Sequence, residues 1–175
     1  HGTDGPLHVQ DVRDKRPMDD VFIQAMNQAG ISSNPDFNGV DQAGCGYYQF
    51  TQSNGRRWST ASAYLKPVRS RTNLAIVTHA HAQRLLFEGK RACGVEIIRR
   101  GKSETIHGAH IILSGGAIAS PQLLEVSGVG DGERLRQLGI DVVHHAPDVG
   151  EHLQDHLLCK VVYGTEPERS INREV

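Results

Sequence analysis

The chain has 175 residues, 38% of them hydrophobic, which is enough for a packed core but far from the composition of a membrane span. Its 19 Lys and Arg residues against 20 Asp and Glu residues give a formal net charge of −1, so it lacks the overall basic field that collects nucleic acid or anionic lipid. The 19 glycines and 7 prolines predict many turns and close backbone approaches.

The N-terminal part predicts one helix followed by a loop-rich region. Residues 18–29 carry an apolar face at helical spacing, with acidic residues in the first turn and a glycine placed to end it, which predicts a packed helix of about three turns. Residues 32–55 are rich in Asn, Asp and Gly and indicate loops, with one candidate strand at 46–51. Residues 59–65 predict a short helix that ends at Pro67.

The middle of the chain predicts a small antiparallel meander. Strands are expected at 84–87, 93–99 and 104–107, because turn residues separate these apolar or alternating segments. Residues 110–114 form a nearly continuous apolar run, which is typical of a strand covered on both faces in a parallel α/β sheet.

The next helix is expected to begin at Ser120 and Pro121, because serine caps free N–H groups and proline suits the first helical position. This helix would cover residues 122–127. A short helix over 133–138 and a strand over 140–144 follow. Together these elements predict an α/β, or mixed α+β, fold.

The turn Ser114-Gly115-Gly116 is the strongest local candidate for a binding site. Glycines at the end of a buried strand let a ligand approach the backbone, and a nearby helix N-terminus favours an anionic or strongly hydrogen-bonding group. The alternative is a tight strand-to-helix turn that holds no ligand. Residues 128–132, Gly-Val-Gly-Asp-Gly, fit a phosphate loop poorly, because they follow a helix and lack the third glycine at the required offset.

The histidines, cysteines and basic residues predict no metal and no nucleic acid partner. His152 and His156 share a helical face, but no Glu lies in the place expected for a zinc protease and no third ligand is evident. The basic residues are too sparse for a nucleic-acid stripe. Three widely spaced cysteines favour a reducing compartment, so a cytoplasmic location is predicted. The alternative is that the whole protein is associated with a membrane.

A longer motif carries a resemblance to a known family. Residues 116–130, GAIASPQLLEVSGVG, resemble the second signature of the glucose–methanol–choline (GMC) FAD-dependent oxidoreductases at every constrained position. Further segments resemble the family in the same order along the chain: Gly5-Pro6-Leu7, Asp36-Phe37-Asn38-Gly39, Gly55-Arg56-Arg57-Trp58-Ser59-Thr60, Arg71-Thr72-Asn73-Leu74, Gly94-Val95-Glu96 and Val149-Gly150-Glu151-His152-Leu153-Gln154-Asp155-His156. The sequence is most similar to the choline dehydrogenase and alcohol dehydrogenase branch.

This resemblance implies a two-domain flavoprotein in which a Rossmann-like portion holds FAD and a substrate domain covers the flavin. Residues 1–70 would belong to the substrate domain, 71–155 to the FAD-binding domain with its β-meander, and 156–175 to the return into the substrate domain. The implied activity is transfer of a hydride from the CH–OH group of an alcohol, choline or a related primary alcohol, to the flavin, which an electron acceptor then reoxidises.

The resemblance also implies which residues meet the cofactor. Ala82 matches the position whose backbone meets the adenine, and Ser114, Gly115 and Gly116 match the strand end beside the ADP half of FAD.

The chain departs from the family pattern in two places. The G-x-G-x-x-G loop and the first signature are absent, and no histidine matches the family's catalytic motif, so no catalytic residue is assigned in this chain. The chain is therefore expected to be an internal fragment of a larger enzyme. The alternatives are a catalytically silent α/β fragment without tight flavin binding and a non-enzymatic nucleotide-binding module.

Overall fold

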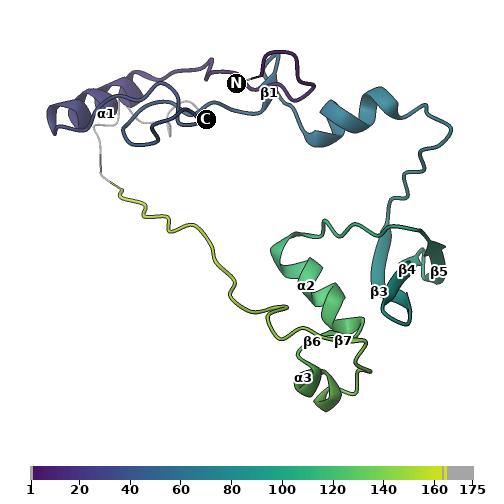
Figure 1. The fold of residues 1–175 in the computed structure, drawn as a ribbon. Helices are drawn as coiled ribbons and strands as arrows, with labels where there is room; N and C mark the ends of the chain where they lie inside the picture. Colours follow the sequence, from purple (N-terminus) through teal and green to yellow (C-terminus); the bar gives the residue numbers. More distant parts are fainter. Residues whose placement is uncertain (1, 163, 165–175) are drawn as a thin grey trace. The chain divides into compact units, whose positions relative to one another are not determined.

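The computed structural model describes residues 2–162 and residue 164, and its elements are labelled in Figure 1. The described residues divide into two compact units, of which the first contains residues 2–75 and the second residues 76–161. Each unit is considered by itself. Of the helices in the described part, none combines the length and the apolar character that crossing a membrane requires.

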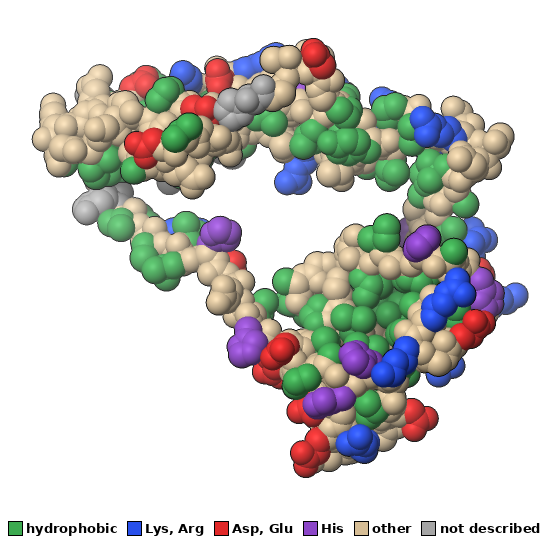
Figure 2. All heavy atoms as spheres, in the orientation of Figure 1, with side chains coloured by type: hydrophobic (Ala, Val, Ile, Leu, Met, Phe, Trp, Pro, Cys, Tyr) green, Lys and Arg blue, Asp and Glu red, His purple; other side chains and the backbone are tan. Residues whose placement is uncertain are grey.

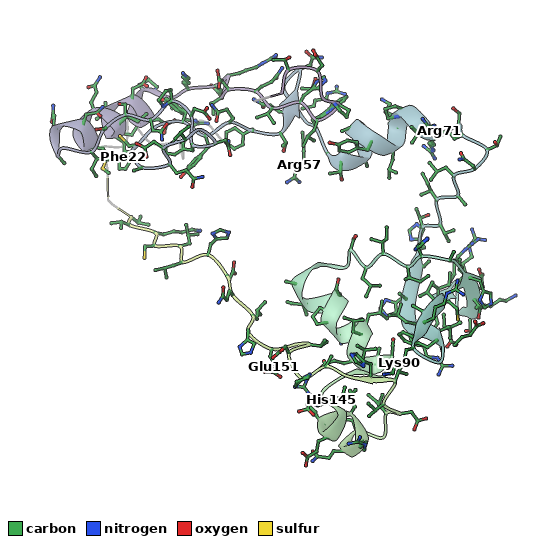
Figure 3. The ribbon with its side chains drawn as sticks, in the orientation of Figure 1. Phe22, Arg57, Arg71, Lys90, His145 and Glu151 are labelled. Carbon is green, nitrogen blue, oxygen red and sulfur yellow. The ribbon has the colours of Figure 1, made fainter. Side chains whose placement is uncertain are left out.

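The first unit begins with helix α1 (Pro17–Gln28), as predicted. Asp19 lies in its first turn and accepts a hydrogen bond from the Arg16 N–H at 3.4 Å, and Gly30 follows the helix with a φ of 87°. The expectation that this helix is packed is wrong, because none of its residues is buried and Phe22, labelled in Figure 3, is 60% exposed. An apolar stripe shows which face favours burial, but a second layer must supply the cover.

Buried Asn34 organises the loops of the first unit. Its side-chain amide donates to the carbonyl oxygens of Asp41 and Ala43 at 2.9 and 3.1 Å, and its side-chain oxygen accepts the Asp36 N–H at 2.8 Å. The Asn34 backbone N–H donates to the carbonyl oxygen of Cys45, which is also buried. These bonds satisfy polar groups that a regular element would otherwise pair.

Two further expectations for the first unit are wrong. Residues 46–51 form no strand; Phe50 makes only an isolated bridge with Gln10, and the short strands β1 (Gln52–Ser53) and β2 (Arg56–Arg57) follow. The helix over 59–65 also continues past Pro67, as the π-helical turn η1 (Ala61–Leu65) and the 3₁₀ turn η2 (Lys66–Val68). Proline is tolerated there because it lies in the first turn of η2, where its missing N–H has no required partner.

The second unit contains the predicted antiparallel meander. Strands β3 (Ala80–Glu88), β4 (Arg91–Arg99) and β5 (Lys102–His107) form a sheet in that order. Arg100 and Gly101 both have positive φ, 52° and 76°, which is the backbone that a two-residue hairpin turn requires.

Helix α2 (Gly116–Val126) packs against β3, and the short strands β6 (Val129–Gly130) and β7 (His144–His145) pair in parallel around helix α3 (Gly132–Gln137). The buried hydrophobic side chains of this unit are Leu85, Ile97 and Leu135, which are 6%, 4% and 1% exposed. Figure 2 shows apolar side chains gathered where α2 meets the sheet. This packing therefore provides the core of the second unit.

Three predictions fail in the second unit. The strand expected over 140–144 is reduced to β7, which covers only His144 and His145. Residues 110–114 form no strand, and Ile112 is 86% exposed, because a strand needs a neighbour to share its hydrogen bonds and the described residues place none beside this segment. Helix α2 begins at Gly116 rather than at Ser120, so that Pro121 lies inside the helix. The Ser120 hydroxyl accepts the Gly115 N–H at 3.0 Å and so caps the helix from within.

Glu96 on the central strand joins all three strands of the sheet. It accepts a hydrogen bond from Ser103 Oγ on β5 at 2.8 Å and another from Arg84 Nε on β3 at 2.6 Å. These two contacts, the serine first, hold the pKa of Glu96 below its ordinary value.

We expect Glu96 to make the stability of the sheet depend on pH. A carboxylate whose pKa is depressed by folding contributes stability that is present above about pH 4.3, the ordinary glutamate pKa, and is lost as the pH falls through the folded-state value. The Tm of the Glu96→Gln variant should therefore fall less than the Tm of the wild type between about pH 5 and pH 3. Identical pH dependence in the two proteins would contradict this role.

Candidate functional site

The second unit contains a groove between the sheet and helix α2, with a volume of ≈ 580 Å³. One wall comes from β3 and β4, the other from α2, and the segment 111–115 closes the space between them. The lining residues are Ala80, His81, Ala82, Gln83, Leu85, Val95, Ile97, Ile111, Ile112, Leu113, Ser114, Gly115, Ala119, Ser120, Gln122, Leu123 and Val126.

Three of the four residues predicted to meet the cofactor line this groove. Ala82 comes from β3, whereas Ser114 and Gly115 come from the turn before α2, and all three are exposed. The structure thus brings together positions that are more than thirty residues apart in the sequence. Gly116, the fourth, begins α2 next to this turn but does not line the groove.

The groove is uncharged. None of its lining residues is Lys, Arg, Asp or Glu, and the buried side chains of Leu85 and Ile97 contribute to an apolar surface. Such a surface suits a flat, neutral ring with polar atoms at its edge, because a charged group would lose hydration there without gaining a partner. A purine ring has this character, whereas a pyrophosphate does not.

The helix N-terminus beside the groove is already partly satisfied. The Gly115 N–H, which would otherwise face an anion, donates to the Ser120 hydroxyl. The expected preference of this turn for an anionic group is therefore weakened at Gly115, while the close approach of a ligand to the backbone is unaffected.

Sequence reasoning missed the polar side chains on the two walls. His81 and Gln83 on β3 and Gln122 on α2 line the groove and carry hydrogen-bonding groups for the edge of a bound ring. Ser120 and Pro121 predict where a helix begins, but they do not predict which of its residues face the groove. The position of Gln122 in the groove wall therefore could not be inferred from them. The polar residues at the start of β3 were the available signal, since they precede the apolar residues 85–87 of the same strand.

The Gly-rich segment 128–132 forms no phosphate loop. It runs from β6 into α3, and the first N–H groups of α3 are already taken: Asp131 Oδ1 accepts the Glu133 N–H at 2.9 Å, and His145 Nδ1 accepts the Gly132 N–H at 3.0 Å. A helix N-terminus with both groups capped has little left to offer a phosphate.

One cluster of charged side chains in the second unit surrounds Arg134, which does not line the groove. The Arg134 guanidinium donates to Glu151 at 2.8 Å and also contacts Glu125, and these two carboxylates, Glu151 first, raise the pKa of Arg134 above its ordinary value. Gly150 lies against Glu125 with a φ of 84°, so the cluster ties the end of α2 to the segment around residue 150. Glu151 is labelled in Figure 3.

Within residues 2–162, no three His, Cys, Asp or Glu side chains come together in a way that could hold a metal ion. Cys45, Cys93 and Cys159 are free thiols, and of these only Cys45 is buried.

Comparisons with known proteins point to one family. The sequence model of the family described as GMC oxidoreductase matches residues 2–158. An alcohol dehydrogenase [acceptor] from Pseudomonas putida is 49% identical over 160 residues, which make up 90% of this chain and 29% of that protein. The mitochondrial choline dehydrogenase of Mus musculus is 50% identical over 157 residues, or 89% of this chain and 26% of that protein. The chain thus spans less than a third of the length of these relatives.

Solved structures share the fold. Pyridoxine 4-oxidase from Mesorbium loti has a TM-score of 0.78 and 32% identity, covering 85% of this chain and 30% of that one. An FAD-dependent oxidoreductase from Chaetomium thermophilum also has a TM-score of 0.78, at 24% identity, covering 83% of this chain and 26% of that one, a likeness that shows the fold alone.

We expect the Ser120 hydroxyl to stabilise the start of α2. Replacing it in Ser120→Ala removes the acceptor of the Gly115 N–H and should cost about 0.5–1.5 kcal/mol, the usual net contribution of one hydrogen bond. Denaturant unfolding of the second unit measures this loss, and Ser120→Thr, which keeps a hydroxyl, is the matched control. Equal stability of the alanine variant and the wild type would show that the bond contributes nothing.

Proposed function

The chain belongs to the GMC oxidoreductase family, and we propose that it is part of an FAD-dependent enzyme that takes a hydride from the CH–OH group of an alcohol. Support comes from the near 50% identity to an alcohol dehydrogenase and a choline dehydrogenase across about nine tenths of the chain. The single structural observation that carries the proposal is the convergence of Ala82, Ser114 and Gly115 on one uncharged groove.

In this proposal, residues 71–155 are the FAD-binding portion, residues 1–70 belong to the substrate domain, and 156–175 begin the return to it. The last range falls largely outside the described residues. The contact-based units, which divide near residues 75 and 161, are compatible with this organisation.

FAD, when bound, supplies the ring that accepts the hydride. The part of this chain is to hold the adenosine end: the Ala82 backbone would lie against the adenine on the sheet side, and Ser114 and Gly115 would approach it from the turn before α2. Because the groove offers no cation, binding of the pyrophosphate would depend on other parts of the enzyme. The chain by itself is accordingly proposed to be inactive.

Choline or a related primary alcohol is the proposed substrate, because both dehydrogenases named above match this chain at similar identity. No residue of the chain is proposed as the base that takes the hydroxyl proton. A small-molecule or protein electron acceptor would complete the reaction in the whole enzyme, and a location in the cytoplasm is retained as part of the proposal.

The test uses the full-length flavoprotein that contains this chain. Anaerobic addition of choline or another primary alcohol should bleach the absorbance of its bound flavin. A protein that retains FAD but is reduced by no primary alcohol would overturn the proposed activity. A titration of the 175-residue chain with FAD tests the alternative, a silent fragment that does not bind flavin tightly. Tight, stoichiometric binding would contradict that alternative.

Gly116 provides a test of the turn itself. Its φ of 87° is strained for a residue with a side chain, so Gly116→Val should shift the turn beside Ser114 and Gly115 at a cost of about 1–2 kcal/mol. We expect the full-length protein with this change to retain less FAD after purification. Because nothing lies within 4 Å of a Cβ at this position, an effect would come from the backbone and not from a local clash. Unchanged retention would indicate that the turn has no role in cofactor binding.

A further inference from the structure

A backbone N–H on the free edge of the sheet is bonded to a serine far away in the sequence. Leu85 lies on β3, an edge strand that pairs only with β4 in its sheet. Its N–H donates to Ser127 Oγ at 2.7 Å, and both residues are buried, with 6% and 8% exposure. A buried N–H requires an acceptor, and here a helix-end serine, rather than another strand, provides it.

The same hydroxyl is also a donor. Ser127 Oγ donates to the carbonyl oxygen of Leu123, one turn earlier on α2, at 2.5 Å. A hydroxyl has one hydrogen, so donation to Leu123 leaves its lone pairs for the Leu85 N–H, and the two bonds are mutually compatible. A single hydroxyl therefore connects the backbone of β3 to the backbone of α2.

The two ends of this bridge lie in opposite walls of the groove. Leu85 belongs to the β3 wall and Leu123 to the α2 wall, and both line the groove that contains Ala82. Ser127 itself does not line the groove, so it can influence a ligand only through the separation of the walls.

The position of Ser127 is itself constrained. Gly128 follows it with a φ of 88°, and a Cβ at Gly128 would lie 2.3 Å from the carbonyl oxygen of Asp141. The Gly128 carbonyl oxygen accepts the N–H groups of Val143 and His144 at 2.8 and 3.1 Å. The end of α2 is thus held in place on one side while Ser127 holds β3 on the other.

We propose that Ser127 is a positioning residue that sets the width of the groove between β3 and α2 through the Leu85 N–H and the Leu123 carbonyl. The inference rests on the proposed function, because it assumes that the groove takes the adenosine end of a nucleotide. Removal of the hydroxyl leaves the Leu85 N–H without its acceptor and lets the walls move apart, although no atom that contacts the ligand has changed.

The experiment compares Ser127→Ala with wild type and with Thr105→Ala, a control that removes an exposed hydroxyl from β5 of the same sheet. Hydrogen exchange of the Leu85 amide reports the bridge, and titration with adenosine, which lacks the phosphates that the groove does not suit, reports the groove. We expect Ser127→Ala to speed the Leu85 exchange and to weaken adenosine binding about tenfold at unchanged stoichiometry, because binding must then restore a spacing of the walls that the buried hydrogen bond no longer holds. The control should change neither.

The outcomes separate the inference from the function on which it rests. Equal adenosine affinity in wild type and Ser127→Ala, or a fall in stoichiometry alone, would show that the serine only stabilises the fold and would overturn its positioning role. Rapid exchange of the Leu85 amide in the wild type would show that the bridge is absent, with the same consequence. No adenosine binding to the wild type would instead overturn the role of the groove, while the exchange data would still report whether the bridge exists.

Discussion

Contact between helix α2 and strand β3 is the constraint on which the second unit depends. The three-stranded sheet is narrow, and its outer strand β3 would leave backbone groups unpaired beside an apolar face. Helix α2 covers that strand, and the Ser127 hydroxyl satisfies the Leu85 N–H where the two elements meet. Burial of Leu85 and Ile97 and the formation of the groove both follow from this contact.

The groove shows how a cofactor surface can be divided among parts of a chain. Its walls are mostly apolar with a few polar side chains, and no Lys, Arg, Asp or Glu lines it, so it suits the neutral ring of a nucleotide better than the phosphates. The groups that could attract an anion nearby are already engaged, at Gly115 by Ser120 and at the start of α3 by Asp131 and His145. The groups that contact the neutral ring of a nucleotide are therefore distinct from the groups that would neutralise the charge of its phosphates.

Predictions from the sequence succeeded where the cause is local. The extent of α1 follows from its periodicity and from Gly30, and the hairpin between β4 and β5 follows from Arg100 and Gly101, which adopt the backbone of a tight turn. Predictions failed where a partner was required from elsewhere. Residues 110–114 have the apolar pattern of a buried strand but no neighbouring strand in the described structure, and α1 has an apolar face that the described residues only half bury.

The sequence by itself determined the family, through the signature of residues 116–130, and the identity of the glycine turn that precedes α2. Only the tertiary structure decided that Ala82 meets Ser114 and Gly115 across one groove, and that Ser127 joins its walls. The reason is that a motif encodes the order of residues along a backbone, whereas a groove is formed by side chains and N–H groups that folding brings together. The bond between Leu85 and Ser127 joins residues 42 positions apart, and no local pattern specifies such a partner.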